Sequence, residues 1–95
     1  MTSGARARAG AARAISILTT IIVLFIVVGI VLVVLEANRS NDIVSVIFDV
    51  AEFFVDPFEN LFTLDDRKVE VAVNWGLGAL VYAIVGRILA RLVAP

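Results

Sequence analysis

Two uninterrupted apolar runs dominate the hydrophobic pattern of the chain. The first, at 15–35, reads "ISILTTIIVLFIVVGIVLVVL" and contains no charged residue. A helix rises about 1.5 Å per residue, so this run can cross the roughly 30 Å hydrocarbon core of a bilayer. A cleavable signal peptide is the alternative, but its apolar core usually has about 7–15 residues, and no A-x-A cleavage signal follows here. We therefore predict an uncleaved transmembrane helix over 15–35.

The second apolar run, at 69–92, is also long enough to span a bilayer. Thr63 or Asp65 is the expected N-cap of its helix, with Asp66 as a partner resembling that of a capping box. Arginines in the last turns favour the same assignment, because cations there complement the helix dipole and can extend to the lipid headgroups. We predict a second transmembrane helix over 69–92.

Between these runs the pattern changes to an amphipathic one. Apolar and polar positions each recur every three or four residues, which predicts a helix over about 41–55, capped by Ser40 or Asn41 and ended before Pro57. A typical interfacial helix has a basic polar face, whereas this one is acidic. Its apolar face is therefore expected to contact lipid, the two spans or another protein. That face comprises Ile43, Val46, Ile47, Val50, Phe53 and Phe54.

The predicted fold is an all-α membrane protein, with two transmembrane helices in a hairpin and an amphipathic interfacial helix between them. Its expected organisation is a flexible basic arm at 1–14, the first span, an acidic outer connection at 36–68, the second span and a short tail at 93–95.

Composition and charge support this organisation. Apolar residues make up 61% of the 95-residue chain, against roughly 45–50% in globular proteins. All nine acids lie in 36–70 with three bases, a net charge of 3 − 9 = −6. Under the positive-inside rule, both termini should be cytoplasmic and the connection should lie on the outer side of the membrane. The arginines that predict this topology are Arg6, Arg8, Arg13, Arg87 and Arg91.

Small residues recur along the second span with steps of three and four. Such a seam lets two membrane helices approach closely, and its period of about 3.5 predicts a left-handed crossing near +20°. Its partner could be the first span of the same chain, another copy or a different protein. The first span has one small residue, Gly29, so its bulky side chains are expected to pack against the seam. The seam comprises Ala72, Gly76, Ala79, Ala83, Gly86 and Ala90.

Few residues could carry chemistry. The chain has no cysteine and no histidine, which excludes disulfides, thiolate metal sites and histidine bases. Glu70 and Asn74 could form an interhelical hydrogen bond or line a pore, or could simply meet water at the outer interface. The central acids lack the spacing of a cation-binding loop. We expect no catalytic site, no metal, no cofactor and no nucleic-acid partner.

The segment 37–92 resembles a family of short actinobacterial membrane proteins of uncharacterised function. The resemblance rests on "ANRSNDIVSVIFDVAEFF" and on "LFTLDDRKVEVAVNWGLGALVYAIVGRILARL". Trp75 stands where the family has an aromatic residue, often tyrosine, and Gly78 where alanine is usual. A fainter similarity to the YggT family rests on "VDPF", without the arginine expected after that proline. The resemblance implies a two-span bacterial membrane protein and no particular activity.

These observations predict a small membrane interaction or accessory subunit without catalysis of its own. It would contact membrane lipids and associate, through the seam, with a homo- or hetero-oligomeric membrane partner. Two alternatives are a homo-oligomeric channel and a structural or lipid-organising protein.

Overall fold

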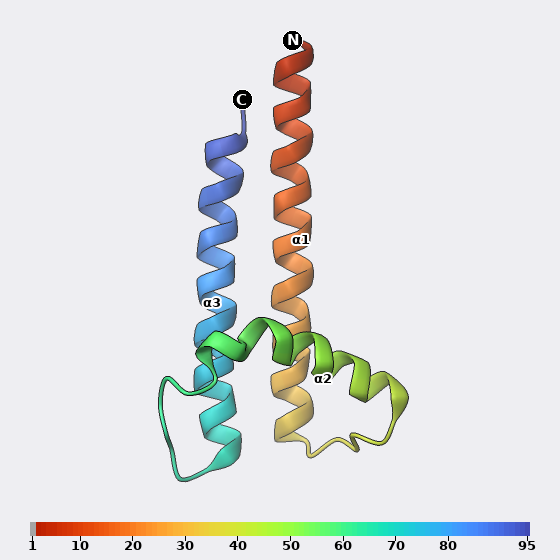
Figure 1. Cartoon of the computed structure of the whole chain (residues 1–95), viewed down its shortest axis with the longest axis vertical. Helices are drawn as coiled ribbons and strands as arrows, with labels where there is room; N and C mark the ends of the chain where they lie inside the picture. The colour runs from red at the N-terminus through yellow and green to blue at the C-terminus, as the bar shows by residue number, and fades with distance from the viewer. Residues whose placement is uncertain (1) are drawn as a thin grey trace.

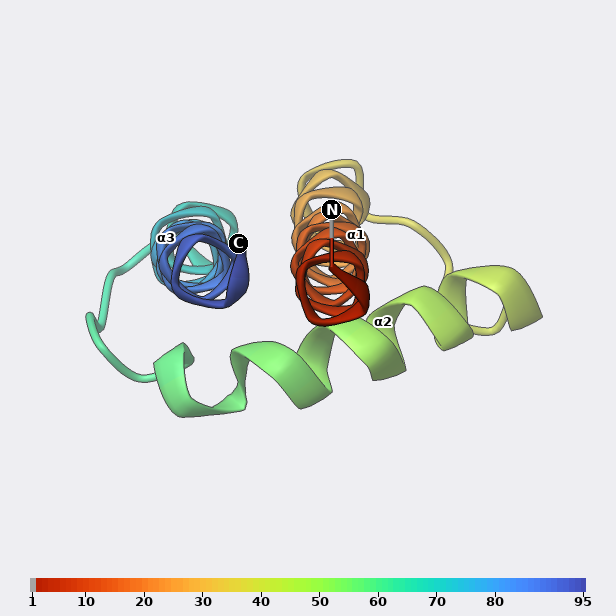
Figure 2. The same cartoon turned by 90° about the horizontal axis from the view of Figure 1, so that it is seen from above.

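The computed structural model describes residues 2–95 and is all-helical over that range. It contains α1 (Ser3–Val34), α2 (Asp42–Val55), a 3-10 turn η1 (Asp56–Phe58) and α3 (Arg67–Val93). Helices α1 and α3 lie side by side in opposite directions, with both chain ends at the same end of the molecule, and α2 crosses them near the other end (Figure 1). Seen from above, α2 lies along one side of the pair (Figure 2). The expected all-helical chain with two helices long and apolar enough to cross a membrane is confirmed.

Helix α1 begins far earlier than the sequence predicts. The Thr2 side chain accepts a hydrogen bond from the Ala5 N–H at 3.2 Å, and the helix continues unbroken from Ser3. Residues 3–14 of the expected basic arm are therefore helical in the structure, and Met1 lies outside the described residues. Alanine and arginine are strong helix formers, and an arm continuous with a long helix extends it without a new nucleation step. Arg8 also fixes this segment by donating from Nε to the Val93 carbonyl at 3.0 Å.

The chain leaves α1 through a tight helix-ending turn. Ala37 N–H donates to the Leu32 carbonyl at 2.9 Å and Glu36 N–H to the Val33 carbonyl at 3.0 Å, which is the Schellman pattern. Glu36 has a φ of 55°, a left-handed conformation usually taken by glycine at this position. Asn41 then caps α2, since its Oδ1 accepts from two backbone N–H groups.

Helix α3 is capped by Asp66, not by Thr63 or Asp65 as expected. The Asp66 Oδ1 atom accepts from Lys68 N–H at 2.8 Å and from Val69 N–H at 3.3 Å. The carboxylate thereby satisfies two donors of the first turn and lies favourably against the helix dipole. Thr63 and Asp65 lie before the N-cap position, which Asp66 occupies directly before the first helical residue.

The buried core lies where α1, α2 and α3 meet, at the end of the molecule away from the termini. Its largest member is Trp75 of α3, which is 2% exposed. A Cβ added to Gly29 of α1 would come within 3.0 Å of the Trp75 ring and 3.1 Å of Ala51 of α2. The sequence predicted bulky side chains of the first span packing against small residues of the second. At this contact the order is reversed, because the bulky Trp75 belongs to α3 and the small Gly29 belongs to α1.

Candidate functional site

Helix α2 has three distinct faces and is the most unusual surface of the molecule. Phe48, Ala51 and Val55 are buried against the two long helices. At about 100° per residue, the acidic side chains occupy a second face and a third face is apolar. On the third face, Ile43 is 72% exposed and Phe53 is 75% exposed. An exposed apolar face therefore remains after α2 has packed.

The predicted apolar face of α2 is this third face. The long helices bury a different set of residues, and of the predicted face Phe54 packs on Tyr82 of α3. Of its six members, Ile43, Val46 and Phe53 are exposed, while Ile47, Val50 and Phe54 are half-buried. The sequence pattern obscures the packing face, because its largest member, Phe48, lies at the border of the acidic arc. The signal that could have found it is a second series with steps of four, three and four: Val44, Phe48, Ala51, Val55.

Contacts on two sides orient α2 on the helix pair. On its acidic side, Glu52 pairs with Arg39 of the α1–α2 connection at 2.8 Å, and the Arg39 guanidinium lies 3.9 Å from the centre of the Phe48 ring. On another side, Tyr82 Oη of α3 donates to the Phe54 carbonyl at 2.7 Å, and the two rings meet edge to face at 5.7 Å. The acidic face therefore lies nearer the connection, and Phe54 lies nearer the middle of α3.

Asn74, predicted as a polar residue within the second span, anchors the chain between η1 and α3. It is 1% exposed. Its Nδ2 donates to the carbonyls of Glu59 and Phe62 at 2.8 and 2.9 Å, and its Oδ1 accepts from Phe62 N–H at 3.1 Å. The Glu70 carboxylate accepts from Leu64 N–H at 3.3 Å. Both residues bind their own connection. Of the alternatives that the sequence left open for Asn74, these bonds match neither an interhelical hydrogen bond nor contact with water, since the side chain is buried.

Glu59 lies beside this anchor in an acidic environment. Partial burial raises its pKa from the ordinary value of 4.5, and the nearby Asp56 and Glu52 raise it further, while Arg67 lowers it. A small cavity of about 100 Å³ adjoins the side chains of Glu59, Arg67 and Asn74, which is room for a few water molecules. Across residues 2–95, no three or more Asp or Glu residues cluster in a way that could hold a metal ion.

The small-residue seam of α3 is only partly used within the chain. Ala79 and Gly86 are buried, while Ala72, Gly76, Ala83 and Ala90 are partly exposed. A Cβ on Gly86 would overlap the Thr19 side chain of α1, whereas a Cβ on Gly76 would meet nothing within 4 Å. The sequence left open which helix packs against the seam. For the buried seam residues Ala79 and Gly86, that helix is α1 of the same chain. Nearer α2 the contact face turns to Val71, Trp75 and Gly78, because α3 packs there on η1 and α1 together.

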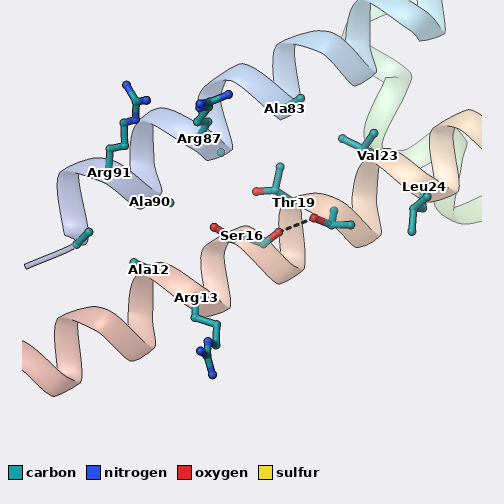
Figure 3. A pocket seen from close by; sticks show the side chains of 13 residues that line it. Ala12, Arg13, Ser16, Thr19, Val23, Leu24, Ala83, Arg87, Ala90 and Arg91 are labelled. Atoms are coloured by element: carbon teal, nitrogen blue, oxygen red, sulfur yellow. Dashed lines mark hydrogen bonds between the residues drawn. The ribbon is translucent and has the colours of Figure 1, made fainter.

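A groove of about 630 Å³ separates the terminal halves of α1 and α3 (Figure 3). Figure 3 shows Ala83 of α3 facing Thr19 and Val23 of α1 across it, and Ala90 facing Ser16 and Ala12. Three of the topology arginines, Arg13, Arg87 and Arg91, also line it. Of the other two, Arg8 donates to carbonyls at the end of α3 and Arg6 is exposed. No pattern in the sequence predicts this groove, because its shape depends on how the two helices are placed.

Comparison of the chain with models of protein families, with curated proteins and with solved structures finds no match. The resemblance to short actinobacterial membrane proteins therefore stays a prediction from the sequence.

Proposed function

We propose that the chain is a small accessory subunit of a bacterial cell membrane, without catalysis of its own. In this proposal α1 and α3 form a transmembrane hairpin, and α2 lies at the outer interface and presents its acidic face to a partner protein. The segregation of charge supports this orientation, because five arginines lie toward the chain ends and all nine acids lie in 36–70.

The three-faced α2 carries the proposal. One face is fixed against the long helices by Phe48 and Val55. Its third, apolar face is exposed, and so are many aliphatic side chains of the long helices, such as Ile17 and Leu24. Together they form an apolar surface larger than soluble proteins usually expose to water. In a bilayer these residues form one lipid-facing belt, and the acidic face is left to water and to a partner.

The proposed partner surface differs from the seam that the sequence suggested. Gly86 and Ala79 already pack within the chain, so the inner seam is not free to bind another helix. The acidic face of α2, with Asp42, Asp49 and Asp56, is exposed and held in a fixed orientation. We therefore place partner binding at this face. The channel alternative gains no support, because the buried Asn74 binds its own connection through both its Nδ2 and its Oδ1 atoms.

Site-specific photo-crosslinking in the native membrane tests partner binding. A photoreactive side chain at Asp49 should give an adduct of one defined mass, and Asp42→Asn with Asp56→Asn should reduce its yield several-fold. The matched control is the same side chain at Ile84, an exposed residue of α3, which should give lipid adducts only. Equal yields with and without the two carboxylates, or no protein adduct at Asp49, would contradict the proposal.

Spin labelling tests the placement of α2. The chain has no native cysteine, so single cysteines at Phe53 and Asp49 can be labelled without background. The label at Phe53 should collide more with oxygen, which concentrates in lipid, and the label at Asp49 more with a water-soluble nickel chelate. If both labels report an aqueous environment, α2 does not lie in the membrane interface.

A further inference from the structure

We propose that the groove between the terminal halves of α1 and α3 binds one anionic phospholipid of the cytoplasmic leaflet. An acyl chain would lie along the partly exposed Ala83 and Ala90, beside the contact of Gly86 with Thr19, and the phosphate would lie among Arg13, Arg87 and Arg91. The inference rests on the proposed membrane placement and adds a specific ligand to it.

The shape and chemistry of the groove fit an acyl chain. Its volume of about 630 Å³ falls in the usual range of ligand sites, roughly 300–1,000 Å³. Although Thr19 and Thr20 lie along it, both hydroxyls donate to their own helix, to the Ile15 and Ser16 carbonyls at 2.7 and 2.9 Å. These hydroxyl donors are therefore already used, and the walls between the helices are mainly alkyl surface.

The charge of the groove fits an anionic headgroup. Arg13 lies on one rim and Arg87 and Arg91 lie on the other (Figure 3). Within residues 2–95, no carboxylate side chain lines this groove and none of the three arginines forms an ion pair. Basic side chains near an anionic membrane surface are attracted to it, and arginine can hold phosphate through two hydrogen bonds.

The guanidinium groups point away from the space between the helices in Figure 3. All three side chains belong to exposed residues, so they can turn toward a phosphate at the cost of ordering a flexible side chain. Binding should therefore reorient them and reduce their mobility.

Other occupants fit the groove less well. A second copy inserted in parallel would bring its own arginines to the same level, where like charges repel. A free phosphate ion would use the arginines and leave the alkyl walls exposed. An amphiphile with an anionic head and an apolar tail satisfies both parts of the groove at once.

Native mass spectrometry of the full chain from mild detergent tests the proposal. The chain is reconstituted with equal amounts of phosphatidylglycerol and phosphatidylcholine, and the lipid retained on the protein is measured. We expect one retained lipid, with phosphatidylglycerol preferred. Arg13→Gln with Arg87→Gln should lower that retention roughly tenfold or more, in line with the loss of two arginine contacts. The control Arg6→Gln with Lys68→Gln removes the same charge away from the groove and should retain the lipid.

A second pair of variants tests the groove walls. Ala90→Leu fills the groove and should reduce retention without changing charge, whereas Ala72→Leu makes the same change at a seam residue outside the groove and should not. Circular dichroism checks that each variant stays helical.

Three results would overturn the proposal. One is equal retention of phosphatidylglycerol and phosphatidylcholine. Another is an equal loss of retained lipid in the Arg6→Gln with Lys68→Gln control, which would show a general effect of surface charge. The third is that the protein is a dimer, that Ala90→Leu dissociates it, and that lipid retention stays unchanged. That result would mean that a second copy occupies the groove. Failure of the membrane placement itself is distinguishable, because the label at Phe53 would then report water.

Discussion

Gly76 and Gly86 both lie on α3, but only Gly86 lies where a larger side chain would clash. At Gly86 an added methyl group would overlap three atoms of Thr19, including its Cβ, so no rotation of that side chain can clear the space. The Thr19 hydroxyl is in addition bound to the Ile15 carbonyl. Gly76 has open space on its Cβ side. The closest approach of α1 and α3 is thus fixed by one glycine of the seam and not by the seam as a whole.

Alanine substitution separates the two positions. Gly76→Ala should be neutral or should stabilise by up to about 1 kcal/mol, the gain in helix propensity. Gly86→Ala should destabilise by about 1–3 kcal/mol despite that gain, because it overpacks the contact with Thr19. The measurement is the free energy of unfolding in mixed micelles. Adding Thr19→Ala should restore part of the Gly86→Ala loss, and equal effects at the two glycines would refute the packing.

Glu59 makes the stability of the connection depend on pH. Because its pKa is raised by burial and by Asp56 and Glu52, the folded chain holds this proton more tightly than the unfolded chain. The stability gained from this proton is present below the ordinary pKa of 4.5 and is lost as pH rises through the higher folded pKa.

The variant Glu59→Gln should remove this dependence. Relative to the variant, the wild-type protein should lose free energy of unfolding as pH rises above about 4.5, and the difference should level off above the folded pKa. Unfolding in micelles across pH 4–8, with both proteins measured in the same series, checks it. Parallel pH profiles for the two proteins would show that Glu59 is not responsible.

At the scale of elements, the connection between η1 and α3 is held by a side chain of the helix that follows it. Asn74 uses its amide oxygen and nitrogen to bind the Glu59 and Phe62 backbone, so the connection folds back on α3. In Asn74→Leu, which has a similar size, the Phe62 N–H and two carbonyls lose their partner. Each lost hydrogen bond of this kind costs about 1–3 kcal/mol when the group stays buried.

Hydrogen exchange measures this effect directly. Amides of residues 59–64 should exchange faster in Asn74→Leu, while amides in the middle of α1 keep their protection. The matched control is Asn60→Leu, an exposed asparagine in the same connection, which should leave exchange unchanged. Unchanged exchange at 59–64 in Asn74→Leu would mean that the connection is held by other contacts.

Helix α2 shows how far a periodic pattern predicts an element. Its existence and approximate ends follow from apolar and polar positions that recur every three or four residues, from Asn41 as a cap and from Pro57 as a stop. Which apolar residues pack could not follow, because α2 has apolar residues on two faces. Ala51 packs inward because Gly29 leaves space on α1 at its level.

At the scale of the whole molecule, the two chain ends lie together and α2 lies toward the opposite end (Figure 1). If α1 and α3 cross the membrane, the ends share one side and the acidic connection occupies the other. A single cysteine at Asp65 should then react with an impermeant thiol reagent on intact cells, and one at Ser3 should react only after the membrane is opened. Labelling of Ser3 on intact cells would reverse the topology.

The sequence alone determined the two long apolar helices, the helix between them and the separation of positive from negative charge, because these depend on local composition and periodicity. Tertiary structure decided which faces meet. In the folded chain Gly29 packs against Trp75 and Gly86 packs against Thr19. Asn74 binds the connection before α3, and one apolar face of α2 stays exposed. Tertiary structure also formed the groove lined by Arg13 and Arg87. These contacts join residues far apart in the chain, and their choice depends on how side chains of different size fit together, which no local pattern encodes.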